Sequence, residues 1–254
     1  MVYCFGEGAP STSAPPADRA KEPEVPYRQT PSQRAALAAR RRTLLGAARA
    51  IVSEQGFGAA SVRAITSRAG VSPGTLYGYF GTLDELLAEV FQEAATVELQ
   101  VVREAVDEAP GSAAARLAAL VDTFAGRAAR SGRLAWALLA EPVSPLIDAE
   151  RLAFHRAYAD TVVRIVADGV ATGELPVQDP QVSGPAVVGA IAEALIGPLS
   201  PLRQAERQNP VDRGIEDVLT SVRLLCLRAV GADRSAPFLD PARPTHLEAC
   251  DDSS

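Results

Sequence analysis

The 254-residue sequence lacks the features that mark secreted, metal-binding or membrane-spanning chains. It has only three cysteines, at positions 4, 226 and 250, and neither their number nor their spacing indicates a disulfide framework or a zinc site. It has no uncharged apolar run of about 18 residues, and its first residues lack the basic and apolar regions of a secretory signal. These absences favour a cytoplasmic protein with no cofactor, no metal and no membrane partner.

Basic residues are in the minority, with 25 Lys and Arg against 31 Asp and Glu, but they are unevenly distributed. Residues 28–82 hold eight arginines and a single acidic residue, Glu54, so this segment carries a net charge of +7 on an otherwise acidic chain. Such a polarised molecule is expected to bind a polyanion through its basic segment, while its acidic remainder is repelled.

Aromatic residues make up only 5% of the chain, whereas alanine is abundant, which favours helices over strands. Apolar residues recur at helical spacing. In the first helix they are Leu37, Leu44, Ala48, Ile51 and Val52. Further helices are expected after Ser61 and Ser72, over 83–108, and near 112–130, 132–140, 145–173, 180–203 and 211–230. The sequence therefore predicts an all-α fold.

The stretch GVSPGTLYGYF, residues 70–80, predicts a tight turn followed by a short helix. Gly70 can end one helix, Ser72 can cap the next, and Pro73 suits its first position. Two short helices joined in this way form a helix-turn-helix, whose second helix enters the DNA major groove. This second helix is uncharged, so the surrounding arginines are expected to supply phosphate affinity while its short polar side chains read bases.

Residues 61–91, SVRAITSRAGVSPGTLYGYFGTLDELLAEVF, resemble the DNA-binding domain of the TetR family of transcriptional repressors. The shared pattern comprises Ile65, Ala69-Gly70-Val71-Ser72, Thr75-Leu76-Tyr77, Tyr79-Phe80 and the leucines that follow. The resemblance covers about residues 34–95. It departs at Leu83, where the family usually has a lysine that grips a phosphate.

The resemblance implies a set of DNA-binding residues. Arg63 matches a position that reaches a base or a phosphate, Thr75 matches a base-contacting position, and Tyr77 matches a groove-contacting aromatic residue. The full candidate set is Arg40, Arg42, Ser61, Arg63, Ser72, Pro73, Gly74, Thr75, Tyr77, Gly78 and Tyr79. Two alternatives stay open: one of the tyrosines can belong to the core, and the arginines at 40–42 can form a solvated face.

The family plan also implies a division into domains. We expect a disordered, proline-rich leader at 1–31 and an N-terminal three-helix helix-turn-helix domain at 32–92. A larger helical effector-binding and dimerisation domain is expected at 93–230, followed by a disordered tail at 231–254. Large rings on neighbouring helices suggest a cavity for a moderately hydrophobic small molecule. The candidate effector-binding residues are Phe124, Trp136, Leu139, Phe154 and Tyr158.

Each of these rings, taken singly, can equally be core. His155 is predicted to be structural or solvent-facing, and Glu141 can be either a helix-end residue or a pocket acid. For assembly, a 4-3-4-3 spacing in the last helix predicts a seam for a second copy of the chain. The seam residues are Val211, Ile215, Val218, Val222 and Leu225.

Together these patterns predict a homodimeric regulator that binds a palindromic double-stranded DNA operator and is released from it by a small-molecule effector. Alternatives are a ligand-independent architectural DNA-binding protein or a protein-interaction module. An enzyme is not expected, because no Ser-His-Asp set, paired carboxylates, phosphate loop or metal cluster is recognisable in the sequence.

Overall fold

The computed structural model describes residues 30–201 and 215–232. The chain divides into two compact units, residues 1–38 and 39–254. In the first unit the described residues are the start of helix α1, where Thr30 and Gln33 form a reciprocal capping box: each backbone N–H donates to the other's side chain, at 2.9 and 3.2 Å. Apart from their edges, the leader and tail expected from the sequence lie outside the described residues.

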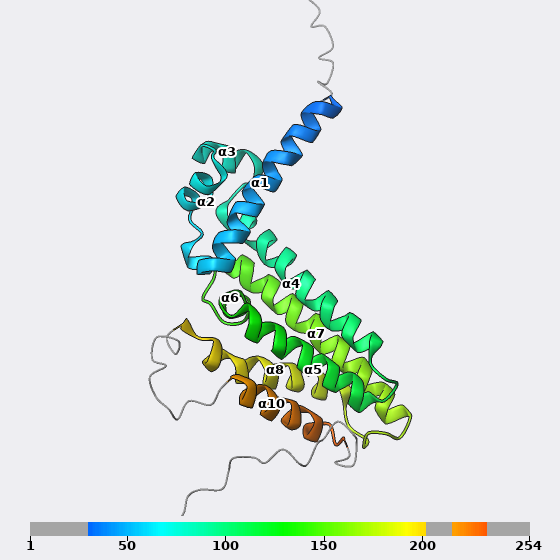
Figure 1. The fold of residues 1–254 in the computed structure, drawn as a ribbon. Coiled ribbons are helices and arrows are strands. Elements are labelled where there is room, and N and C mark those ends of the chain that lie inside the picture. The colour runs from blue at the N-terminus through cyan, green and yellow to red at the C-terminus, as the bar shows by residue number, and fades with distance from the viewer. Residues whose placement is uncertain (1–29, 202–214, 233–254) are drawn as a thin grey trace, which may run out of the picture. The chain divides into compact units, whose positions relative to one another are not determined.

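The described part of the chain is helical throughout, without strands, as the sequence predicts (Figure 1). The elements are α1 (Pro31–Gln55), a short 3-10 helix η1 (Phe57–Ala59), α2 (Val62–Ala69), α3 (Pro73–Tyr79), α4 (Leu83–Glu108), α5 (Ala113–Ser131), α6 (Arg133–Leu139), α7 (Pro145–Ala171), α8 (Pro180–Leu199) and α10 (Ile215–Ala229).

Local sequence signals set the boundaries of the helix-turn-helix. The Ser61 hydroxyl accepts a hydrogen bond from the Ala64 N–H at 3.2 Å and so caps α2. Gly70 ends α2 with φ of 67°, a left-handed conformation that favours glycine. The α3 helix, too short to be stable alone, is held by Leu76, which is fully buried.

One apolar cluster organises the DNA-binding region. It is built from α1, η1, α2, α3 and the start of α4, with Ala137 of α6 and Ile147 of α7. Leu44, Ile65, Leu76 and Leu86 are all fully buried in it. The predicted apolar face of α1 is buried from Leu44 onward, whereas Leu37 is 40% exposed. The core of this region therefore begins one helical turn or more later than the periodicity suggested.

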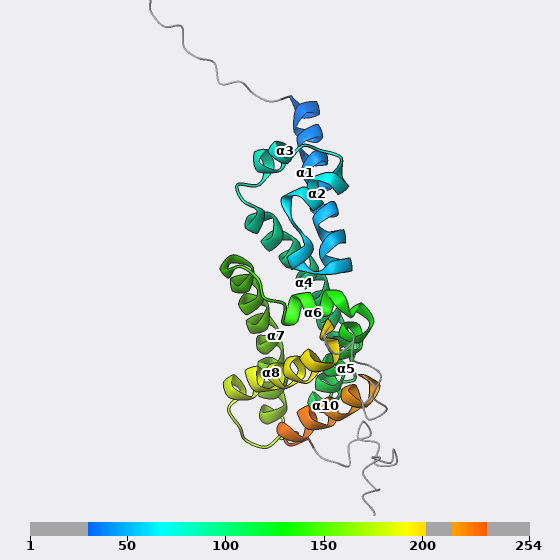
Figure 2. The same cartoon turned by 90° about the vertical axis from the view of Figure 1, so that its left-hand side faces the viewer.

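A second cluster organises the C-terminal helices α5, α7, α8 and α10 with the later part of α4. Figures 1 and 2 show α10 lying beside α5 and α8, in agreement with their contacts. Helices α7 and α8 approach closely because residue 184 is glycine: a Cβ there would lie 2.9 Å from the Ala159 carbonyl oxygen. Gly184 thus serves packing within the chain.

Candidate functional site

Helix α3 presents a polar, open surface. Tyr77 is 54% exposed, and Ser72, Gly74 and Gly78 are also exposed. Tyr79 is half-buried and packs against the core of the DNA-binding region. The structure therefore places one tyrosine outward and the other largely inward, as expected for two residues spaced by two on a helix.

Ser72 and Thr75 form a hydroxyl pair at the start of α3. Ser72 occupies the N-cap position, as predicted, but its side chain makes no capping hydrogen bond to the backbone. Its hydroxyl oxygen lies 2.9 Å from that of Thr75 instead. Because a hydroxyl offers one donor and two acceptor sites, the pair retains unused hydrogen-bonding capacity on an exposed surface.

The two glycines of α3 have no packing role inside the described part of the chain. A Cβ added to Gly74 or Gly78 would meet no atom within 4 Å. Glycine within a helix is less stable than alanine by about 0.5–1 kcal/mol. These two positions therefore carry a cost that intramolecular packing does not explain, and they leave the backbone open to close approach from outside.

The arginines of the basic segment fall into two groups. Arg41 is held by Glu89 through two hydrogen bonds, one of 2.6 Å, and stacks 4.7 Å from the centre of the Phe80 ring. The hydrogen bond with Glu89 is also the main reason that the pKa of Arg41 is raised. Arg68 is similarly paired with Glu54, at 2.6 and 2.7 Å.

By contrast, Arg40, Arg42 and Arg63 are exposed, and the described residues offer them no ion-pair partner. Arg34 and Arg49 are likewise exposed and have no ion-pair partner among the described residues, so their guanidinium groups are also available to phosphate. The structure thus separates the run Arg40-Arg41-Arg42 into one structural residue, Arg41, and two available ones.

Leu83, the departure from the family pattern, is the first residue of α4. It is half-buried and packs against the core of the DNA-binding region. A capping box surrounds it: the Thr82 hydroxyl accepts from the Glu85 N–H at 3.1 Å, and the Glu85 carboxylate accepts from the Gly81 N–H at 2.9 Å. The side chain at 83 therefore contributes apolar packing at the position of the usual lysine.

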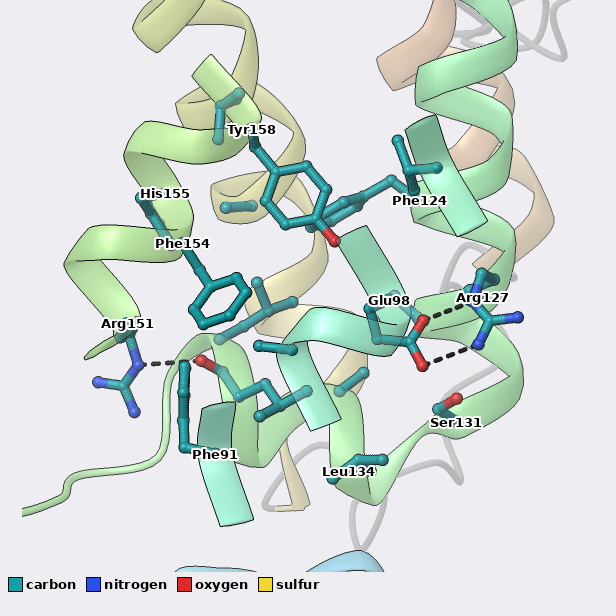
Figure 3. Close-up of a pocket in the computed structure, with 18 residues that line it drawn as sticks. Phe91, Glu98, Phe124, Arg127, Ser131, Leu134, Arg151, Phe154, His155 and Tyr158 are labelled. Carbon is teal, nitrogen blue, oxygen red and sulfur yellow. Dashed lines mark hydrogen bonds and ion pairs between the residues drawn. The ribbon is translucent and has the colours of Figure 1, made fainter. Parts of the chain in front are cut away.

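A cavity of about 70 Å³ lies between α4, α5, α6, α7 and α8 (Figure 3). Of the effector residues predicted from the sequence, Phe124, Leu139, Phe154 and Tyr158 line it. Most of the other lining residues are apolar too, including Phe91. The rings form two contacting pairs: Phe124 and Tyr158 meet edge to face at 5.1 Å, and Phe91 and Phe154 lie 6.1 Å apart.

Trp136 does not line this cavity. The lining residues of α6 are Leu134, Ala135, Leu138 and Leu139, which lie on one face of the helix. At 100° per residue, position 136 points away from that face, and Trp136 packs against the C-terminal core instead. Its ring therefore belongs to the core that supports the cavity wall, and its indole N–H is not the polar group inside the cavity.

The polar groups of the cavity come from residues that the sequence did not single out. Glu98 on α4 accepts two hydrogen bonds from Arg127 on α5, one of them 2.9 Å long. The Tyr158 hydroxyl makes no hydrogen bond to any described residue, and Figure 3 shows it directed into the cavity. Burial is the main reason that the pKa of Tyr158 is raised, so this group stays a neutral phenol.

His155 also lines the cavity, contrary to the structural or solvent-facing role expected for it. Burial, and secondarily the charge of Arg151, lowers its pKa, so the imidazole is neutral near pH 7. Glu98 and Arg127 are 29 residues apart in the sequence and lie on different helices, so no local sequence pattern predicts that they pair.

The segment after α6 links the cavity wall to the DNA-binding region. Glu141 is only 8% exposed, and its two carboxylate oxygens accept the N–H groups of Phe57 and Gly58, each at 3.0 Å. Arg133, at the start of α6, donates to the Gln55 carbonyl at the end of α1. Glu141 is thus neither of the two alternatives considered for it: it holds the turn between α1 and α2.

Arg151 on α7 completes this link, because it lines the cavity and also holds the segment that carries Glu141. Its guanidinium group donates to the Leu138 carbonyl at 2.9 Å and to the Glu141 carbonyl at 2.7 Å. Gly56, with φ of 90°, makes room for the arrangement, since a Cβ there would collide with the Glu141 carboxylate.

The predicted dimer seam is only partly available to a partner. Val222 is 3% exposed and lies in the chain's own core, where α10 packs on α5 and α8. Ile215 and Val218 are half-buried, Leu225 is 55% exposed, and Val211 lies outside the described residues. The assignment of Val222 to the dimer interface is therefore wrong: packing within one chain produces the same 4-3 spacing.

Helix α8 also presents apolar surface to the solvent. Val182 is 65% exposed, and a Cβ added to Gly189 or Gly197 would meet no atom within 4 Å. By length and composition α8 is the one helix in the described ranges that could span a membrane. Its inner face is packed in the core, with Leu195 fully buried.

The described residues thus combine a helix-turn-helix, a structure that binds DNA, with a larger helical body that encloses an apolar cavity. The family described as bacterial regulatory proteins, tetR family, matches residues 44–90. This match covers the helix-turn-helix region and confirms the resemblance of that region to the TetR family of transcriptional regulators.

Three solved structures illustrate the similarity in fold. A TetR/AcrR-family regulator from Thermobifida fusca is 26% identical, with 74% of this chain and 97% of that chain covered and a TM-score of 0.54. FadR from Bacillus subtilis, in complex with stearoyl-CoA, is 19% identical, with 74% and 98% covered and a TM-score of 0.58. RolR with resorcinol is 18% identical, with 79% and 91% covered and a TM-score of 0.58. No curated protein matches the chain.

Proposed function

We propose that this protein is a homodimeric transcriptional repressor that binds a palindromic operator and leaves it when a small molecule enters the cavity described above. One observation carries the proposal: α6 forms part of the cavity wall, and the segment that follows it holds the helix-turn-helix through Glu141. A ligand that displaces α6 thereby acts on the DNA-binding region directly.

The exposed face of α3 supports sequence-specific binding. Thr75, Ser72 and Tyr77 offer hydrogen-bonding groups without charge, and the open backbone at Gly74 and Gly78 allows a close approach to base edges. Arg40, Arg42 and Arg63 add sequence-independent attraction to phosphates. Pro73 and Ser61 flank this face at the starts of α3 and α2.

The apolar outer surface of α8 supports a homodimer. An apolar surface that includes Val182, together with the exposed Leu225 of α10, is covered when two copies pair about a two-fold axis. Two-fold symmetry places two recognition helices on successive turns of the major groove, which explains a palindromic site. A soluble dimer of this kind acts on DNA in the cytoplasm.

The cavity supports regulation by a small molecule. It combines apolar walls with a few converging polar groups, which is the usual construction of a ligand site. The two structurally similar regulators were solved with very different molecules, stearoyl-CoA for FadR and resorcinol for RolR. The fold therefore accommodates ligands of several sizes, and the cavity of each chain decides which.

Release follows from differential binding. A ligand shifts the protein only as far as its affinity differs between the DNA-bound and the released geometry. Displacement of Leu134, Leu138 or Leu139 by a ligand moves the α6 segment that ends at Glu141, and Glu141 holds the η1 turn. By linkage, operator DNA lowers the affinity for the ligand by the same factor.

The proposal is tested with the full chain and DNA from upstream of its own gene, by fluorescence anisotropy over a salt series. We expect a dimer to bind this DNA at least 100-fold more tightly than random DNA, because specific binding exceeds non-specific binding by about 10³-fold or more. Equal affinity for both DNAs would favour an architectural protein, and no binding at low salt would favour an interaction module.

A further inference from the structure

The size of the cavity limits its ligand. Its volume of about 70 Å³ is roughly five to seven times the volume that one enclosed water needs, about 10–15 Å³. A cavity of about 150 Å³ binds benzene, so a single six-membered ring enters this one only when its walls shift slightly outward. A long acyl chain does not fit without rearrangement of the surrounding helices.

The walls favour a flat ring. Phe124 and Tyr158 form one side, edge to face at 5.1 Å, and Phe91 and Phe154 form another. Ring edges and faces attract other rings in offset or edge-to-face arrangements, by about 0.5–1.5 kcal/mol beyond simple burial. Alanines at 95, 128, 135 and 192 line the same space and leave it unfilled.

The polar groups favour a neutral ligand with a hydroxyl group. The charges of Glu98 and Arg127 already neutralise each other. The Glu98 carboxylate would therefore repel an anionic ligand, and the Arg127 guanidinium group would repel a cationic one, with no free counter-ion for either. The Glu98 oxygens keep lone pairs that Arg127 does not use. Tyr158 brings a hydroxyl with no partner among the described residues into the same cavity (Figure 3).

We propose that the effector is a small, uncharged, single-ring compound that carries a hydroxyl group, of the phenol class. Its ring packs between the Phe124–Tyr158 and Phe91–Phe154 pairs. Its hydroxyl donates to Glu98 and accepts from Tyr158, which gives the Tyr158 hydroxyl a partner. This inference rests on the proposed role of the cavity as the effector site.

Calorimetric titration of the DNA-free dimer with four probes tests the ligand class. Phenol is expected to bind at least tenfold more tightly than toluene, which has the same size but lacks the hydroxyl. It is expected to exceed benzoate and octanoate by at least as much, because the first is charged and the second is charged and long. Tighter binding of toluene, benzoate or octanoate than of phenol overturns the proposal.

Two variants locate the binding in this cavity. Tyr158→Phe keeps the ring and removes only the hydroxyl, so the preference for phenol over toluene is expected to fall by about tenfold, the loss of one hydrogen bond. Ala192→Leu fills the cavity and is expected to abolish binding of both. Leu152→Gln, on the exposed side of α7, is the matched control that leaves both affinities unchanged. An unaltered preference in Tyr158→Phe, or binding that survives Ala192→Leu, contradicts the proposal.

Failure of the ligand class and failure of the proposed function give different results, because binding is measured without DNA. If phenol binds as expected and operator DNA stays bound at saturating phenol, the ligand class stands and the proposed release is wrong. If octanoate both binds best and releases DNA, the release stands and the ligand class is wrong.

Discussion

The surface of α3 and the cavity between α4 and α8 differ in how their polar groups are satisfied. On α3 the hydroxyls of Ser72 and Thr75 are at the surface, where a partner can reach them. In the cavity Glu98 and Arg127 are largely enclosed and satisfy each other. A surface that reads DNA keeps its groups free, whereas an interior that selects a small molecule must first neutralise its charges, because unpaired buried charges are strongly destabilising.

The same contrast appears among the arginines of the DNA-binding region. Arg41 and Arg68 are paired with carboxylates, and Arg40, Arg42 and Arg63 are not. The paired arginines stabilise the fold, and the unpaired arginines are the ones that we propose to bind phosphates. Residue type alone therefore does not separate a structural arginine from one that is available to phosphate; the presence or absence of an internal partner does.

The largest expected effect comes from disrupting the proposed dimer. Leu225→Glu combined with Val182→Glu places charges on the exposed apolar surface and is expected to give monomers. Operator affinity should fall by about 10²–10⁴-fold, because the second half-site no longer benefits from being linked to the first. Light scattering and anisotropy measure the two effects. Leu152→Glu is the matched control on an exposed site of α7, and a double variant that stays dimeric moves the interface elsewhere.

The two regions also differ in how far their sequence predicted them. The helix-turn-helix was readable because its signals are local: the Ser61 cap, Gly70 at a left-handed position and the Thr82 capping box all lie within a few residues of what they determine. The cavity rings were partly readable from helical spacing. The Glu98–Arg127 pair and the Glu141 contact were not, since they join residues 29 and about 84 positions apart.

Val222 and Trp136 show the limit of periodicity. A repeat of apolar residues predicts that a helix face is covered, but it does not identify the element that covers it. The repeat in α10 therefore predicts a partner chain at Val222, whereas α5 and α8 of the same chain cover this residue. Trp136 was assigned to the cavity because large rings often line one. The Trp136 ring points away from the cavity. Its orientation depends on how α6 lies relative to α4 and α7, which the sequence does not reveal.

The next effect tests the connection between the two regions. Glu141→Gln removes the charge and one of the two acceptors that hold the Phe57 and Gly58 N–H groups. The folded state is expected to lose about 1–3 kcal/mol, the cost of a buried donor left unsatisfied. The effector should then change operator affinity by a smaller factor than in the natural protein. Urea unfolding and anisotropy with and without effector are the measurements.

Glu141→Asp is the matched variant for that experiment, because it keeps the charge and shortens the reach. If Glu141→Gln is destabilised and the effector still releases DNA by the original factor, Glu141 supports the fold alone and the coupling runs elsewhere, with α4 as the remaining continuous connection.

A smaller effect distinguishes base reading from phosphate binding on the DNA-binding surface. Thr75→Ala is expected to cost about 1–3 kcal/mol on the operator and little on random DNA. Arg42→Ala should weaken both DNAs equally and reduce the salt dependence by about one unit. Arg63→Ala decides between the two roles for that residue. Equal losses on both DNAs for Thr75→Ala would assign Thr75 to a phosphate.

Leu83→Lys tests whether apolar packing has replaced a phosphate contact. A lysine can lay its methylene chain over the surface that Leu83 covers and extend its ammonium to the solvent. The salt dependence of binding to any DNA is therefore expected to steepen by about one unit, with a modest gain in affinity. An unchanged dependence would mean that the end of the side chain does not reach the DNA from this position.

The smallest expected effects come from one substitution in α3, which should raise the stability of the fold and lower the affinity for DNA. Gly78→Ala adds a methyl group where no atom of the described chain lies within 4 Å, so it should stabilise the fold by about 0.5–1 kcal/mol, since alanine suits a helix better than glycine. If Gly78 is there to let DNA approach the backbone, the same change weakens operator binding. Thermal unfolding and anisotropy on one protein sample measure both quantities. A more stable variant with unchanged DNA affinity would show that the groove does not come close to this part of α3, and that recognition depends on its first turn, at Ser72 and Thr75.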